Sequence, residues 1–441
     1  MQPSTAFAAL VLLCPLASNA QIKRTSVPLG DALDEALAKT SLTTADAHPF
    51  HIRITVDEPE NPQSPYQGSI EEWWISKDQW RREVTDKDGL HQTIVVANGT
   101  TTEKDEGEYF PLWLRSFVNA AFDPIPNSEA FRNSGATIDQ ITLPNGQKSS
   151  PNVRLQSKIG TGERATDAFS NVSFDNQGRL DFYGSPRYSM EFHDYRKFAN
   201  KDVAREFVDH PEPGTRLVGK VITLEDESKA DRADLFTPLP NPDTDSRFRS
   251  ITVNSQQLES FTAGAPPIVW PTVRSGNTRG QLAMYISIDS QGQVREAWPL
   301  NSDNAGLEDP TREQVKKWKI NPPRDKDGKP LQIDGGLGFH FDTKVDNPLP
   351  VLTSPDDIAK QMSGCTYHPK LPAGVLQSRQ SITVRLSVNE QGKLTGESFK
   401  GPDAFSVFGQ SGLHTRECIF KPYLVDGRPS YYFIDLTFTA P

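Results

Sequence analysis

Few residues of the 441-residue chain have the types and spacing that catalysis or metal binding requires. The sequence contains no H-E-x-x-H pair, no G-x-S-x-G turn, no glycine-rich phosphate loop and no paired C-x-x-C. The eight histidines are scattered, and no carboxylate or cysteine stands at ligand spacing beside His48 and His51. Glu71 and Glu72 are adjacent, so in a strand they point to opposite faces, where we expect one or both to be solvated. We therefore expect no metal, no cofactor and no enzymatic activity, with an enzyme of unknown chemistry as a third hypothesis.

The N-terminus determines how the three cysteines are interpreted. Residues 1–20 contain an apolar run from Ala6 to Leu16 and end in small residues. An apolar run of about 11 residues is too short to span a bilayer, which takes about 20. We predict a signal peptide cleaved after Ala20, and hence an exported, periplasmic protein without an integral membrane segment. A lipoprotein anchor at Cys14 is the alternative, although the preceding residues lack the small side chains usual at such sites.

Cleavage leaves two cysteines, Cys365 and Cys418, in the mature chain. An even count in an exported protein favours a disulfide, and two separate buried thiols are the alternative. A bridge closing a loop of about 54 residues would stabilise its domain by roughly 4 kcal/mol on the chain-entropy account.

The amino-acid composition argues against some classes of binding partner. The net charge is −10, and no run of like charge stands out, which argues against nucleic acid or an anionic membrane as the main partner. The 35 prolines and the hydrophobic fraction of 35% favour loops and strands over long helices.

An internal repeat organises the C-terminal part of the chain. The segments that begin at Arg279 and Arg379 match position by position at an offset of 100. Each has an alternating strand, an Asp/Asn-x-Gln-Gly turn, a second strand, a short helix and a last strand. The helices are expected at 309–317 and at about 410–417. The sequence therefore predicts two small domains, each a β-hairpin, a helix and a β-strand.

The repeat contains, in this order, a hydrophobic strand, a D-x-x-G-x-V hairpin, a helix, a W-x-[FI]-x-P segment and a D-G-x-P turn. This series resembles the C-terminal domain of TonB-type energy transducers. The second copy is similar to a variant with cysteine in place of the tryptophan, because Cys418 stands where the first copy has Trp318 and Cys365 precedes it. Such energy transducers have a membrane anchor and a long spacer, whereas this chain is expected to have a short signal peptide. This difference argues against transmission of force from an inner-membrane motor.

The resemblance implies capture of an extended peptide by strand addition to a sheet edge. We expect the last strand of the second copy to be this edge, with a closed or self-paired edge as the alternative. Its outward residues, the predicted partner-binding set, are Tyr431, Phe433, Asp435 and Thr437. The expected partner is an envelope protein or extended peptide, such as one from an outer-membrane transporter. In the first copy, the glycines at 335, 336 and 338 are expected to break the last strand or to admit another backbone.

The N-terminal part reads as successive antiparallel strands with helices near 27–42 and 111–122. Its early aromatic strands, with Trp73, Trp74 and Trp80, resemble periplasmic lipoprotein carriers of the LolA kind, in which a curved sheet folds over an apolar groove. These tryptophans either pack the sheet or line a groove for an apolar ligand.

These observations predict an α+β chain in which a curved, half-barrel-like antiparallel sheet precedes two small TonB-C-like domains. The predicted boundaries are a sheet domain at 27–240, a linker at 241–263, the first repeat at 264–345, a linker at 346–364 and the second repeat at 365–441. The predicted function is an exported non-enzymatic binding protein of the cell envelope. The alternative is a periplasmic carrier of an apolar ligand or lipoprotein.

Overall fold

The computed structural model describes residues 23–440 with short gaps. The predicted signal peptide at 1–20, with Cys14, lies outside the described residues. Within the span, the residues left out are 45, 127, 143–147, 150–152, 187, 212–214, 230–231, 245, 322, 347, 372–374, 377–379, 402–403, 410, 414 and 416–417.

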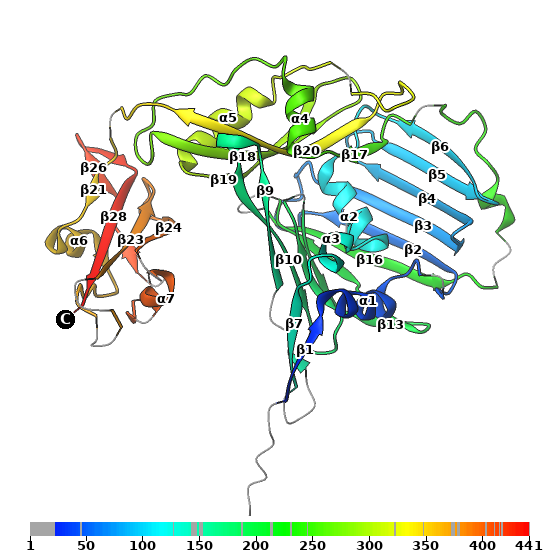
Figure 1. The fold of residues 1–441 in the computed structure, drawn as a ribbon, viewed down its shortest axis with the longest axis horizontal. Coiled ribbons are helices and arrows are strands. Elements are labelled where there is room, and N and C mark those ends of the chain that lie inside the picture. The colour runs from blue at the N-terminus through cyan, green and yellow to red at the C-terminus, as the bar shows by residue number, and fades with distance from the viewer. Residues whose placement is uncertain are drawn as a thin grey trace, which may run out of the picture. The chain divides into compact units, whose positions relative to one another are not determined.

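An antiparallel sheet of 11 strands is the framework of the N-terminal part, as predicted. The strand order is β6-β5-β4-β3-β2-β16-β15-β12-β11-β10-β9, so the first and last long strands, β2 and β16, pair at its centre. Figure 1 shows the sheet curving between β6 and β9. Its strands are β2 (Phe50–Asp57), β3 (Gly68–Ser76), β4 (Gln79–Asp86), β5 (His91–Ala97), β6 (Thr100–Glu106), β9 (Val153–Ile159), β10 (Thr166–Phe174), β11 (Leu180–Gly184), β12 (Ser189–His193), β15 (Glu206–Asp209) and β16 (Leu217–Asp226).

Three helices cover one face of this sheet: α1 (Leu29–Thr40), α2 (Leu112–Phe122) and α3 (Ser128–Arg132) (Figure 1). In α1, Leu29, Leu33 and Ala36 are fully buried at helical spacing. In α2, Leu114 and Phe117 are fully buried in the same core as the inward residues of β2. A cavity of about 20 Å³ lies between the C-terminal ends of α1 and α2 and the sheet.

Smaller elements flank the sheet. A three-stranded sheet consists of β1 (Lys23–Pro28), β7 (Thr137–Thr142) and β8 (Lys148–Ser149), and a hairpin consists of β13 (Arg196–Phe198) and β14 (Lys201–Val203). The 3-10 helices are η1 (Gly162–Arg164), η2 (Ala233–Phe236) and η3 (Ala305–Leu307).

The first repeat is a four-stranded sheet of order β17-β20-β18-β19 with two helices. Its elements are β17 (Ser250–Thr252), α4 (Ser255–Thr262), β18 (Arg279–Ile288), β19 (Val294–Ser302), α5 (Glu308–Val315) and β20 (Gln332–Asp342). The segment 241–263, predicted to be a linker, therefore contains a strand and a helix. The prediction missed β17 because three residues carry no periodic pattern.

The second repeat has the same strand order, β21-β28-β23-β24. Its elements are β21 (Val351–Leu352), α6 (Pro355–Gln361), β22 (Met362–Ser363), β23 (Ser381–Val388), β24 (Leu394–Lys400), α7 (Ala404–Gly409), β25 (Ile419–Phe420), β26 (Tyr423–Val425), β27 (Arg428–Ser430) and β28 (Tyr432–Thr439). The predicted linker at 346–364 thus holds β21 and α6. The structure has a helix at Ala404–Gly409, whereas the helix predicted at about 410–417 falls partly outside the described residues. Three residues of α7, Ala404, Val407 and Phe408, belong to the core of the second repeat.

The two repeats agree in local detail. Both hairpins have a β-bulge at the end of the first strand, at Ile288 and at Val388. In both turns one side chain, of Asp289 or Asn389, accepts hydrogen bonds from the backbone N–H groups two and four residues later. The sequence offset of 100 is therefore also a structural equivalence.

The sheet domain and most of the first repeat belong to one compact unit, residues 1–269, 281–302 and 308–340, and the second repeat lies wholly in the other. Residues 264–345, the predicted first repeat, are thus divided between the two units.

Candidate ligand-binding site at the seam

A buried ion pair fastens the first repeat to the sheet domain along what we call the seam, where α2, β9–β12 and β15 meet β18–β20. The Arg115 guanidinium of α2 donates to the Asp334 carboxylate of β20 at 3.0 Å, and both side chains are almost inaccessible to solvent. The Tyr285 hydroxyl and the Thr252 hydroxyl also donate to Asp334. Ser287 accepts from Arg115 at 3.4 Å. The charges are therefore compensated, as burial requires.

A second carboxylate from the first repeat caps α2. The helix begins after Pro111 and has no side-chain cap of its own. Glu296 of β19 supplies the missing acceptor, because the backbone N–H of Leu112 donates to it at 2.7 Å and the Tyr109 hydroxyl at 2.8 Å. The Trp298 indole N–H donates to the other oxygen at 2.9 Å. Burial raises the pKa of Glu296, and these hydrogen bonds oppose the rise.

Glycines bring the backbones of the two parts together. A Cβ at Gly338 would lie 2.2 Å from the Arg164 carbonyl oxygen and 3.0 Å from the Gly160 Cα, and one at Gly336 would lie 2.6 Å from Ile159. The expectation that glycines break this strand is wrong, since β20 runs unbroken over 11 residues. The alternative, close approach of another backbone, is confirmed.

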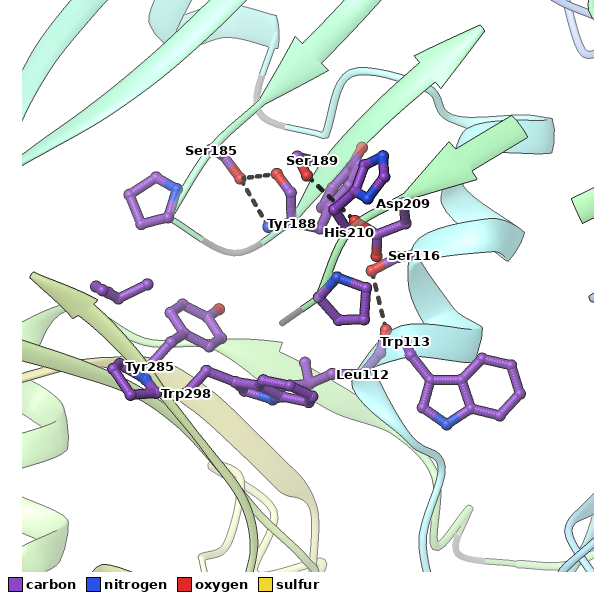
Figure 2. Close-up of a pocket in the computed structure, with 14 residues that line it drawn as sticks. Leu112, Trp113, Ser116, Ser185, Tyr188, Ser189, Asp209, His210, Tyr285 and Trp298 are labelled. Carbon is purple, nitrogen blue, oxygen red and sulfur yellow. Dashed lines mark hydrogen bonds between the residues drawn. The ribbon is translucent and has the colours of Figure 1, made fainter. Parts of the chain in front are cut away.

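A cavity of about 180 Å³, the seam cavity, opens beside these contacts. Figure 2 shows Tyr285 and Trp298 of the first repeat on one side, with Ser185, Ser189 and Asp209 of the sheet domain opposite. Its lining residues are Leu112, Trp113, Ser116, Ser185, Pro186, Tyr188, Ser189, Asp209, His210, Pro211, Tyr285, Trp298, Pro299 and Leu300. The cavity therefore has several aromatic walls and one carboxylate.

Asp209 stands at the end of β15 and is 4% exposed. Ser189 donates to it at 3.2 Å. Burial raises the pKa of Asp209 to about 7, although backbone and Ser189 hydrogen bonds favour the carboxylate. Within the described part of the chain, no lysine, arginine or histidine forms an ion pair with it.

Two more cavities share walls with the seam cavity. One of about 320 Å³ shares Trp113 and Trp298, and it is also lined by Arg295, Arg312 and Lys316. The other, of about 280 Å³, shares Tyr188 and Tyr285 and extends to the glycine stretch of β20. The three cavities thus follow the seam, and its aromatic side chains separate them.

Two serine hydroxyls of the seam cavity donate to oxygen acceptors. Ser189 donates to Asp209, and Ser116 donates to the Leu112 carbonyl at 2.9 Å. The His210 ring instead approaches Glu191 at 3.9 Å. Neither Ser189 nor Ser116 thus donates to an imidazole, the contact that activates a nucleophilic serine.

The cysteine prediction is confirmed: Cys365 and Cys418 form a disulfide. The free-edge prediction for the last strand is wrong. β28 lies between β23 and β21, because the two-residue β21 pairs with Phe433 and Ile434. A strand as short as Val351–Leu352 leaves no pattern that could have revealed this.

The predicted partner-binding residues do face away from the core of the second repeat. Tyr431, Phe433 and Asp435 are half-buried and Thr437 is exposed. Asp435 accepts two hydrogen bonds from Arg385, each of 2.7 Å. Whether this face contacts a partner stays a prediction.

The other singled-out residues have structural partners. His51 contacts Glu71 at 2.8 Å, whereas His48 contacts Asp226 at 3.0 Å. We expected one or both of Glu71 and Glu72 to be solvated. Glu72 is only 1% exposed and pairs with Arg82.

Of the three tryptophans expected either to pack the sheet or to line a groove, none lines the seam cavity. Trp74 stacks on Phe50 in the core, and Trp73 stacks on His51 on the opposite face of β3. Trp80 contacts the Arg82 guanidinium. Trp113, Trp298 and Asp209 are not among the site residues predicted from the sequence. The only local feature that they share is a proline one or two positions away.

Among the described residues, no group of three or more histidine, cysteine or carboxylate side chains could hold a metal ion. Nor does any helix in the described part of the chain have the length and apolarity to cross a membrane.

No protein-family model matches the chain, and no curated protein does. Among solved structures, the chain is similar to an outer membrane lipoprotein-sorting protein domain from Vibrio parahaemolyticus, with 10% identity, a TM-score of 0.22, and coverage of 47% of this chain and 95% of that one. A LolA superfamily protein from Nitrosomonas europaea is 9% identical, with a TM-score of 0.24 and coverage of 48% of this chain and 98% of that one. MucB, in a structure with MucA, is 13% identical, with a TM-score of 0.23 and coverage of 58% of this chain and 74% of that one. At such low TM-scores, these likenesses carry no argument about what this chain binds.

Proposed function

We propose that the protein is an exported, non-enzymatic binding protein of the cell envelope that holds a small ligand in the seam cavity. The observation that carries this proposal is the cavity itself, which lies between two parts of the chain and has aromatic walls from both. Concave sites of this kind, mostly apolar with a few polar groups, are where proteins bind small molecules. A ligand there would touch α2 and β19 at once.

The disulfide between Cys365 and Cys418 supports the proposed compartment. Structural disulfides form and persist in oxidising compartments such as the periplasm. The predicted signal peptide is consistent with the same destination.

The small size of the cavity between α2 and the sheet supports placing the ligand at the seam. The 20 Å³ cavity between α2 and the sheet has room for about one water molecule and none for an acyl chain. Carriage of an apolar ligand in this cavity would require α1 or α2 to move. The seam cavity needs no such movement.

The test is to incubate the purified mature protein with an envelope extract, re-isolate it, and identify the bound small molecules by mass spectrometry. We expect a ligand to accompany the wild type and to be lost from Trp298→Ala, which removes one wall. Trp73→Ala is the matched control, because Trp73 lies on the outer face of β3 and lines none of the three cavities. Absence of any bound molecule, or equal retention by both variants, would contradict the proposal.

Strand addition to the second repeat is the second candidate function. Among the strands that the structure describes, β24 has β23 as its one neighbour, so its other side is an edge. An extended peptide could pair there through backbone hydrogen bonds. Protection of the Leu394–Lys400 amides from hydrogen exchange on adding an envelope extract would support it, and unchanged exchange would remove it.

A further inference from the structure

Asp209 is a buried carboxyl group that lacks a cationic partner among the described residues. An ionised carboxylate in such a place is costly unless a charge or several hydrogen bonds compensate it. Ser189 supplies one hydrogen bond, and backbone N–H groups supply the others. The side chain lines a cavity with room for several water molecules, so a ligand group could reach it.

The aromatic walls opposite Asp209 are fixed in position. The hydroxyl of Tyr285 is held by Asp334, and the indole N–H of Trp298 is held by Glu296 at 2.9 Å. Both acceptors also bind α2, through Arg115 or through the Leu112 N–H. The rings are therefore oriented by the same contacts that dock the first repeat. A pre-oriented site loses less entropy when a ligand binds.

We propose that the seam cavity binds the ammonium group of an organic cation, with Asp209 as its counter-ion and the rings of Trp298 and Tyr285 as its walls. This inference depends on the proposed function, because it names the class of ligand that the same cavity takes. A carboxylate beside electron-rich ring faces attracts an organic cation both by charge and by cation–π contact.

The lining residues argue against other ligand classes. Asp209 repels an anion, and its carboxylate is the only one among the lining residues, whereas a hard metal cation needs several oxygen ligands. A neutral apolar ligand would leave the carboxyl group without a counter-ion.

The test is isothermal titration of the full mature chain at pH 8 with three organic cations: choline, 2-phenylethylamine and cadaverine. The neutral control ligand is 3,3-dimethylbutan-1-ol, which has the shape of choline without its charge. We expect at least one cation to bind, choline to bind at least tenfold more tightly than its neutral analogue, and Asp209→Asn to weaken cation binding at least tenfold. Glu191→Gln is the control for long-range charge, because Glu191 pairs with His193 and His210 and does not line the cavity.

The outcomes separate the two proposals. If choline and its neutral analogue bind equally and Asp209→Asn changes nothing, or if none of the three cations binds, the inference about an organic cation is overturned. The proposed function then still stands if envelope extract yields a neutral or anionic molecule that Trp298→Ala releases. Equal loss of cation binding in Glu191→Gln and Asp209→Asn would also overturn the inference, since the effect would then be general electrostatics.

Discussion

Arg115 and Asp334 lie 219 positions apart in the chain, and their side chains meet at 3.0 Å in a region closed to solvent. The contact joins a helix of the sheet domain to the central strand β20 of the first repeat. It makes the seam a fixed interface rather than a chance contact, because neither charge could stay buried without the other.

Removing one partner of this pair is expected to destabilise the protein strongly. Asp334→Ala should lower the free energy of unfolding by about 3–5 kcal/mol, because it leaves the Arg115 charge buried and uncompensated. The double variant Arg115→Met with Asp334→Ala should be more stable than Asp334→Ala alone. Denaturant unfolding of the two single variants and the double variant measures this coupling, and simple additivity would contradict it.

The close packing at Gly338 gives a second prediction. Gly338→Ala should cost about 1–3 kcal/mol, because the new Cβ would overlap the Arg164 carbonyl oxygen and push β20 away from the loop after β9. Gly264→Ala is the matched control, since a Cβ there meets nothing within 4 Å. Thermal unfolding of both variants tests the prediction, and equal midpoints would count against a tightly packed seam.

Reduction of the disulfide should weaken the second repeat and leave the sheet domain folded. Cys365 and Cys418 are 53 positions apart, so opening the bridge should cost about 4 kcal/mol by the chain-entropy account. The expected result for Cys365→Ser with Cys418→Ser is loss of protection from hydrogen exchange in β23 and β28, with β2–β5 unchanged. A uniform loss across all of these strands would show that the repeat does not unfold by itself.

The Asp209 carboxyl group should make stability depend on pH. Its pKa rises from an ordinary value of 3.8 to about 7 in the folded state, so the folded protein binds this proton more tightly than the unfolded chain. The stabilisation is complete below about pH 4 and is lost as pH rises through about 7, a change on the order of 4 kcal/mol.

Asp209→Asn isolates this contribution, because other buried carboxyl groups titrate alike in both proteins. The wild type minus Asp209→Asn difference in unfolding free energy should fall between pH 4 and pH 8. Its constancy over that range would mean that Asp209 is not buried in solution. The titratable neighbours of Asp209 to be watched are His210 on the same loop, Glu191 on β12, Tyr188, and Tyr285 on β18.

Much of the fold could be predicted from residue alternation. Tyr432, Ile434, Leu436 and Phe438 alternate in the sequence and are all buried, and the turns at Asp289 and Asn389 form as their residue types indicate. The disulfide followed from the cysteine count. Short strands such as β17 and β21 could not be predicted, because two or three residues carry no period.

The seam could not be predicted from the sequence, for a different reason. Asp209 is one acidic residue at the end of a four-residue strand, and its burial arises only when β15 pairs with β12 and β16 and the first repeat covers the end of the sheet. Likewise, nothing near Glu296 in the sequence indicates that it caps a helix 184 positions away. Such sites are made by distant contacts, which local patterns do not encode.

The most direct measurement is the ¹⁹F NMR spectrum of the full chain labelled with 5-fluorotryptophan, titrated with the low-molecular-mass fraction of an envelope extract. The seven tryptophan signals can be assigned by single Trp→Phe variants. If the seam cavity is the binding site, the signals of Trp113 and Trp298 will shift while those of Trp73 and Trp80 stay in place. A spectrum in which Trp113 and Trp298 do not respond, or in which Trp73 and Trp80 shift in their place, would contradict the account.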